Sequence, residues 1–137
     1  MNEELRKIIN QRMERAKETL DESILLLENN HVRSSVSRLY YACFYSVSAL
    51  MLLDGHYSSK HSGLIALFDR HWVAQGKIPK EMGRFYRRLY DRRQKSDYSD
   101  MAIFSSEDVK GWVEETRHFI NIIEDTIKSN YQGQTLS

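Results

Sequence analysis

The segment from Ser37 to Leu53 constrains the fold most, because its apolar residues cover every face of a helix instead of one stripe. Such a helix must be buried on all sides. Arg38 lies near its start, serines recur at Ser46 and Ser48, and Asp54 follows its end. Its fully apolar run is therefore shorter than the roughly 18 to 20 residues that span a bilayer. The segment predicts the central core helix of a bundle.

Four aromatic residues gather in this segment: Tyr40, Tyr41, Phe44 and Tyr45. They fit two interpretations. All four rings can pack into the core of one chain. Alternatively, some of them form an interface with a second copy, since tyrosine suits an interface where its hydroxyl stays hydrogen-bonded. Both interpretations stay open, and the second predicts a homodimer.

The remaining chain predicts an all-α protein of one domain. A length of 137 residues fits one domain, and a single proline with six glycines leaves little material for β-turns. Apolar residues recur every three or four positions in four further segments, which predicts amphipathic helices. We expect five helices, at about 2–28, 32–54, 61–75, 79–95 and 105–127, within a helical domain over 1–130, and a frayed polar tail over 131–137.

The cysteine and histidine content indicates the compartment and excludes common cofactor sites. Cys43 is the one cysteine and cannot form an internal disulfide, which together with the lack of a signal peptide predicts a cytoplasmic location. There is no glycine-rich phosphate loop, and the histidines do not fall at metal-ligand spacings. We therefore expect no metal and no cofactor. The histidines are His31, His56, His61, His71 and His118.

A net charge of +1 conceals an uneven distribution of charge. The segment 77–95 holds eight basic residues against Glu81 and Asp91, and the segment 97–125 holds eight acidic residues against Lys110 and Arg117. One interpretation is that the two segments pair with each other as neighbouring antiparallel helices. The other is that the basic segment contacts phosphate groups.

Arg93 is the most informative single residue of the basic segment. It follows Leu89 by four positions and so faces inward, where a charge without a partner is very costly. Asp97 is the local partner at the i+4 position. The pair is either a structural ion pair at the rim of the bundle or part of a cleft. In such a cleft Arg93, with Asp97 and the phenol of Tyr98, meets a phosphate-bearing ligand.

The start of the third predicted helix is a weaker candidate for anion binding. Lys60 and His61 lie in its first turn, where free backbone N–H groups and the positive end of the helix dipole favour an anion. The alternative is an ordinary solvated helix end.

Three motifs in this order resemble the HEPN domain family, in its branch of small stand-alone bacterial and archaeal proteins. They are RLYYACF from Arg38, KHSG from Lys60 and RQKSDY from Arg93, and the resemblance extends from Leu5 to Ile127. It implies a five-helix, mostly up-and-down antiparallel bundle that forms a homodimer. It also implies a minimal nucleotidyltransferase as the antitoxin partner in a toxin–antitoxin pair.

Many HEPN proteins are metal-independent ribonucleases, in which an arginine is followed roughly four to six residues later by a histidine at the dimer cleft. The histidine transfers a proton to or from the ribose hydroxyl or the leaving oxygen, and the arginine stabilises the charge on phosphorus. Here no histidine follows Arg92 or Arg93, and Asp97 and Tyr98 stand at those positions. With ordinary pKa values of about 3.9 and about 10, neither suits proton transfer at neutral pH. His61 would have to approach from another helix.

The resemblance therefore predicts a protein of toxin–antitoxin type that binds or acts on RNA or nucleotides as a homodimer. Ribonuclease activity is one hypothesis, and a non-catalytic nucleotide- or RNA-binding adaptor or assembly module is the alternative. We expect no membrane association and no sequence-specific recognition of DNA. The candidate catalytic residues are Arg93, Asp97 and Tyr98, and the candidate phosphate-binding residues are Arg38, Lys60, His61, Arg88 and Arg92. Tyr98 is also a candidate acceptor for nucleotidyl modification by the partner.

Overall fold

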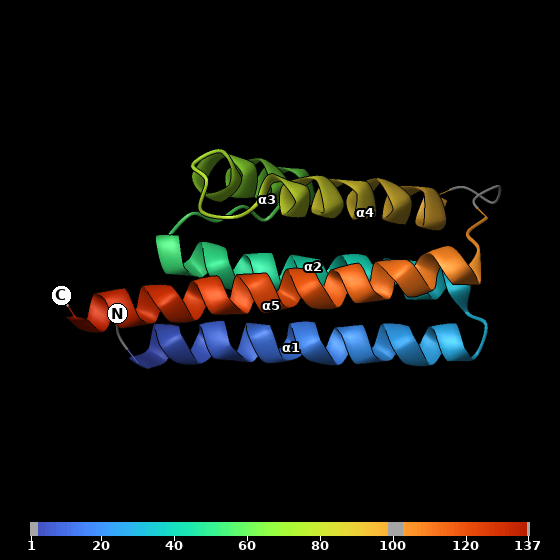
Figure 1. Cartoon of the computed structure of the whole chain (residues 1–137), viewed down its shortest axis with the longest axis horizontal. Helices are drawn as coiled ribbons and strands as arrows, with labels where there is room; N and C mark the ends of the chain where they lie inside the picture. The colour runs from blue at the N-terminus through green and yellow to red at the C-terminus, as the bar shows by residue number, and fades with distance from the viewer. Residues whose placement is uncertain (1–2, 99–102, 137) are drawn as a thin grey trace.

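The computed structural model describes residues 3–98 and 103–136, with side chains described from 3 to 97 and from 103 to 131. The described residues form five α-helices and one π-helical turn, which confirms the predicted all-α bundle. Successive long helices run in opposite directions, so the bundle is mostly up-and-down (Figure 1). The elements are α1 (Glu3–Glu28), α2 (Val32–Asp54), α3 (His61–Phe68), η1 (Asp69–Val73), α4 (Lys80–Tyr98) and α5 (Ser106–Leu136).

Helix α2 is the central helix of the bundle, as its sequence predicts. It packs against α1, α3, α4 and α5, with α1 on one side and the α3 and α4 layer on the other (Figure 1). Among the described helices, α2 is the one that is long and apolar enough to cross a membrane, and most of its apolar window is buried against its neighbours. Burial of this kind is what the core helix of a bundle requires.

One stripe of α2 departs from the predicted burial on every face. Its residues recur every three or four positions and are partly exposed, because the described helices cover this side of α2 only in part. We call this surface the α2 stripe: Ser37, Arg38, Tyr41, Phe44 and Tyr45. Of the four aromatic residues of this segment, Tyr40 is fully buried in the core, whereas Tyr41, Phe44 and Tyr45 are partly exposed.

Local signals in the sequence set the first turns of the fold. Gly55 ends α2 in the left-handed conformation, with φ of 73°, which glycine adopts without steric cost. Two buried serines stabilise the hairpin between α1 and α2, since the hydroxyl oxygens of Ser23 and Ser35 lie at a hydrogen-bond distance of 2.9 Å. The Ser35 hydroxyl also donates to the Ser23 carbonyl at 2.9 Å. This contact fixes the position of α2 along α1.

The third predicted helix, 61–75, is interrupted in the structure by the π-helical turn η1. The Ala74 amide donates to the Asp69 carbonyl at 2.7 Å, a spacing of five residues in place of four. The wider turn keeps both Phe68 and Trp72 buried, while Asp69 pairs with Arg87 of α4. The periodicity of apolar residues alone did not predict this change from α-helix to π-helix, because an α-helix and a π-helix both bury an apolar residue on each turn.

Two helices extend beyond their predicted ends. Helix α4 continues past Lys95 because Ser96 is buried and its hydroxyl donates to the Arg33 carbonyl at 3.0 Å. Helix α5 includes residues 131–136, which the sequence predicts as a frayed tail. Tyr131 lies under the guanidinium of Arg6, which is 4.5 Å from its ring centroid, and this contact with α1 favours a longer helix.

Candidate functional site

Arg93 occupies the inward face of α4, as its spacing from Leu89 predicts. Its side chain is only 14% exposed, and its Nε lies 2.9 Å from the Asp97 carboxylate in an i,i+4 ion pair. Its Nη2 donates to the Tyr41 hydroxyl at 3.0 Å. The guanidinium carbon is 5.3 Å from the Tyr41 ring centroid and 5.6 Å from that of Tyr40. Arg93 is therefore held between one carboxylate and two aromatic rings of the central helix.

His61 joins the same group from the start of α3. Its Nδ1 lies 2.6 Å from the Tyr40 hydroxyl oxygen, a hydrogen-bond distance. Its ring centroid is 4.7 Å from that of Phe44 and 5.9 Å from that of Tyr41. Burial lowers the pKa of His61, and the positive charge of Arg93 lowers it further. His61 is therefore neutral at neutral pH and able to accept a proton.

We call these five residues the Arg93 cluster: Tyr40, Tyr41, His61, Arg93 and Asp97. The cluster unites three separate helices. Burial raises the pKa of the Tyr40 phenol, so its hydroxyl keeps its proton across the physiological range. The sequence identified Tyr40 and Tyr41 as core or interface aromatics and not as site residues. Their positions within the RLYYACF motif were the signal that could have identified them as site residues.

A polar groove opens beside the cluster, with a volume of about 560 Å³. Asp97 is a residue of both the Arg93 cluster and the lining of this groove. The Arg38 guanidinium lies 5.0 Å from the Tyr41 ring centroid and 3.6 Å from the Glu22 carboxylate, so Arg38 stands where groove and cluster meet. Arginines and hydroxyls are the groups that proteins use to bind phosphate. The groove is lined by Leu26, Arg33, Ser34, Ser37, Arg38, Ser96 and Asp97.

The other predicted site residues lie at different places. Lys60 is exposed and directly precedes His61, with its backbone N–H bonded to the Ser58 hydroxyl at 3.2 Å. Arg88 is exposed, and the Arg92 guanidinium lies 3.8 Å from the ring centroid of Trp112 on α5. The structure does not bring Arg92 into the Arg93 cluster. Tyr98 is the last residue of α4, and its side chain lies outside the described residues.

The charged segments of α4 and α5 interact only in part as one interpretation of the sequence predicts, since Arg92 of α4 lies within electrostatic range of Glu115 and Asp108 of α5. Among the described residues no ion pair joins the two helices, because α4 packs chiefly against α2. Glu124 of α5 instead pairs with Lys17 of α1 at 2.6 Å. Arg87 of α4 pairs with Asp69 of η1. Much of the basic surface of α4 is therefore exposed.

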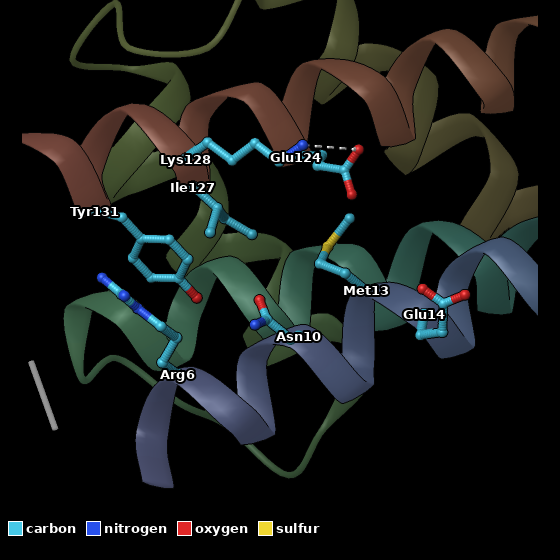
Figure 2. Close-up of a pocket in the computed structure, with 8 residues that line it drawn as sticks. All are labelled: Arg6, Asn10, Met13, Glu14, Glu124, Ile127, Lys128 and Tyr131. Carbon is cyan, nitrogen blue, oxygen red and sulfur yellow. Dashed lines mark ion pairs between the residues drawn. The ribbon is translucent and has the colours of Figure 1, made fainter. Parts of the chain in front are cut away.

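A second cleft, of about 520 Å³, lies between α1 and α5 (Figure 2). The guanidinium of Arg6 covers the ring of Tyr131 at one end, and Lys128 pairs with Glu124 at 3.8 Å at the other. None of the predicted site residues lines this cleft. Within the described part of the chain, no three His, Cys, Asp or Glu side chains gather as metal ligands. The Arg93 cluster is therefore the stronger candidate site.

Comparison with known proteins identifies the family. A model of the HEPN domain matches residues 9–126, which includes every element of the Arg93 cluster. The chain belongs to the HEPN domain family. The resemblance carried by the three sequence motifs is thereby confirmed.

HEPN relatives of similar length occur in bacteria and archaea. A protein of Thermotoga maritima named "UPF0332 protein" is 45% identical over 93% of this chain and 96% of its own length. A protein of Methanocaldococcus jannaschii named "Putative toxin" is 32% identical over 93% of this chain and 95% of its own. A second protein of that archaeon, also named "Putative toxin", is 29% identical over 86% of this chain and 78% of its own length.

Proposed function

We propose that this HEPN protein is a toxin-type protein that acts on RNA as a homodimer, with the Arg93 cluster and the adjacent groove as its RNA-binding site. The observation that carries the proposal is the placement of Arg93, which is largely buried and forms an ion pair with Asp97, a residue that lines the polar groove. A guanidinium has five N–H donors, more than the contacts with Tyr41 and Asp97 require. The names of the archaeal relatives support a toxin.

The chemistry around Arg93 favours RNA over a single free phosphate. The groove adds Arg38 and the hydroxyls of Ser34 and Ser37, so several phosphates can be contacted in succession. The partly exposed ring of Tyr41 lies beside the Arg38 guanidinium. Aromatic rings next to a basic groove are the usual means of binding single-stranded RNA, because unpaired bases stack on them.

The α2 stripe supports the homodimer. Phe44 and Tyr45 leave apolar ring surface at a side of α2 that the described helices cover only in part, and aromatic residues are enriched at protein interfaces. A second copy that packs on this stripe brings two Arg93 clusters close together. The composite site of two chains then follows from one self-complementary contact.

We expect a particle of twice the 16.2 kDa chain mass in light scattering coupled to size-exclusion chromatography. Tyr45→Glu should shift the dimer to a monomer, because the glutamate places a charge in the apolar contact between the two copies. Tyr57→Glu is the matched control, since Tyr57 is already 56% exposed and lies outside the stripe. A monomeric wild-type protein at high concentration would contradict the homodimer.

For RNA binding, Arg93→Gln should weaken affinity about tenfold or more, because hydrogen bonds to a charged group contribute about 1.5–3 kcal/mol each. Fluorescence anisotropy with a labelled single-stranded RNA measures this. The slope of log affinity against log salt concentration should decrease in magnitude by about one, which corresponds to the loss of one phosphate contact. Arg84→Gln, on the exposed side of the same helix, is the matched control and should change affinity little.

Equal losses of affinity in Arg93→Gln and Arg84→Gln would indicate general charge attraction and would reject the site. Binding that depends on Arg93 without any cleavage of RNA would favour the alternative function, a non-catalytic RNA- or nucleotide-binding adaptor. The ion pair of Arg93 with Asp97 suits either function, since it holds the guanidinium in place before a ligand arrives.

We further propose a nucleotidyltransferase antitoxin as the partner, with Tyr98 as the acceptor of the nucleotidyl group. Tyr98 directly follows Asp97, a residue of both the cluster and the groove. A phosphate group attached there adds negative charge beside the RNA site, which opposes the binding of RNA phosphates. Modification at this residue would therefore switch the site off.

A further inference from the structure

The Arg93 cluster contains a histidine that the order of residues in the chain does not reveal. His61 lies 32 positions before Arg93 and on a different helix, yet the charge of Arg93 acts on its imidazole. The positions where HEPN ribonucleases carry a histidine in the sequence include Asp97 and Tyr98 here, and Asp97 is occupied by its ion pair with Arg93. A group that can transfer a proton is therefore present, but it comes from α3.

We propose that His61 is the proton-transfer residue of this site, accepting the 2′-hydroxyl proton of RNA at Nε2 while the Tyr40 hydroxyl holds Nδ1. This inference rests on the proposed RNA function and deepens it. Tyr40 is a positioning residue: its oxygen is 2.6 Å from Nδ1, and its ring is buried against α4. The proposal requires the tautomer in which Nδ1 donates its hydrogen to Tyr40, which leaves the lone pair of the imidazole at Nε2.

The surroundings of His61 suit a base at neutral pH. Two helices and its own segment contribute the charged and titratable groups near it. Helix α2 contributes Tyr40 and Tyr41, and the segment of His61 itself contributes Lys60. Helix α4 contributes Arg93, together with Tyr86 and Tyr90, which lie behind Tyr40. No carboxylate among the described residues contacts its ring directly. Burial and the charge of Arg93 both lower its pKa, so the imidazole is neutral before RNA binds and one ring nitrogen can accept a proton.

The reaction is a transesterification within the RNA. The 2′-oxygen attacks phosphorus and its proton passes to His61 Nε2, so that a P–O2′ bond forms while the P–O5′ bond breaks. The departing 5′-oxygen takes a proton from water, and the imidazolium later returns its own proton to the hydroxide left behind. The products are a 2′,3′-cyclic phosphate and a 5′-hydroxyl end. Arg93 stabilises the negative charge that increases on the phosphoryl oxygens.

The test measures cleavage of a mixed RNA by the purified full chain in EDTA. His61→Gln should lower kcat by about a hundredfold or more, the usual contribution of a general base, while RNA affinity changes little. His118→Gln is the control, because His118 is exposed on α5. Circular dichroism reports the fold of each variant, and His61→Asn provides a second variant if the first does not fold.

The pH profile separates a base from a structural residue. The wild-type kcat/KM should rise with pH as His61 loses its proton, with a midpoint below its ordinary pKa of 6.5. This rising limb should be absent in His61→Gln. Tyr40→Phe keeps the packed ring, so it should lower kcat by about tenfold yet keep a rising limb.

Two results would overturn the inference: wild-type kcat in His61→Gln, or no cleavage by the wild-type protein. In the second case, RNA binding that still depends on Arg93 would preserve the binding part of the proposed function, and only His61 as a base would be abandoned. Loss of both cleavage and Arg93-dependent binding would reject the proposed function itself.

Discussion

Replacing Phe119 with alanine will lower the free energy of unfolding by about 3–5 kcal/mol. Phe119 is fully buried on α5, and its ring joins that helix to two others. The ring centroid lies 6.1 Å from that of Phe68 on α3 and 5.8 Å from that of Tyr86 on α4. Removing the ring leaves a cavity that its rigid neighbours on α3 and α4 cannot fill.

Denaturant unfolding followed by circular dichroism measures this loss, at one fixed protein concentration so that any dimer contributes equally. The matched control is Leu25→Ala on α1. Leu25 is 60% exposed, so the change should alter stability by less than about 0.5 kcal/mol. A loss from Phe119→Ala no larger than that from Leu25→Ala would mean that α5 does not pack across the core as described.

Expression of the wild-type chain in a bacterial host will arrest growth, and Arg93→Gln will restore the growth rate of a culture with an empty vector. The proposed toxicity depends on the binding of RNA phosphates by Arg93. Glutamine lacks the positive charge of arginine and its planar set of N–H donors. Growth curves after induction, at matched protein levels in immunoblots, measure the effect.

Arg84→Gln should leave the growth arrest unchanged, since Arg84 is exposed on the opposite side of α4 from the cluster. Co-expression of a nucleotidyltransferase encoded beside this chain should restore growth and add a nucleotidyl mass to the peptide that contains Tyr98. Restored growth with unmodified Tyr98 would contradict Tyr98 as the acceptor. Continued growth of cells that express the wild-type chain would contradict the toxin.

Much of the fold was predictable because its signals are local. The apolar spacing of α2 predicted a central helix, and Gly55 predicted its end. The ion pair of Arg93 with Asp97 was also predictable, since positions four apart on one helix are neighbours whatever the rest of the chain does. The motifs RLYYACF, KHSG and RQKSDY were sufficient to predict the family, which the match over residues 9–126 confirms.

The parts that could not be predicted depend on which helices become neighbours. Opposite charges on α4 and α5 indicated a pair, but burial of apolar surface placed α2 against both of them. The contact of His61 with Tyr40 joins residues 21 positions apart through the packing of α3 on α2. Helical periodicity carries no information on such contacts, and so the sequence could name His61 as a candidate from another helix but could not place it beside Tyr40.

The most direct test of an Arg93-centred RNA site is the cleavage of a mixed RNA in EDTA by wild-type protein and Arg93→Ala, prepared identically. We predict that the wild-type protein produces 2′,3′-cyclic phosphate ends. Arg93→Ala should produce none, while its melting curve and particle mass stay those of a folded protein. Equal cleavage by both proteins, or no cleavage by the wild-type protein when the RNA is saturated, would contradict a ribonuclease built around Arg93.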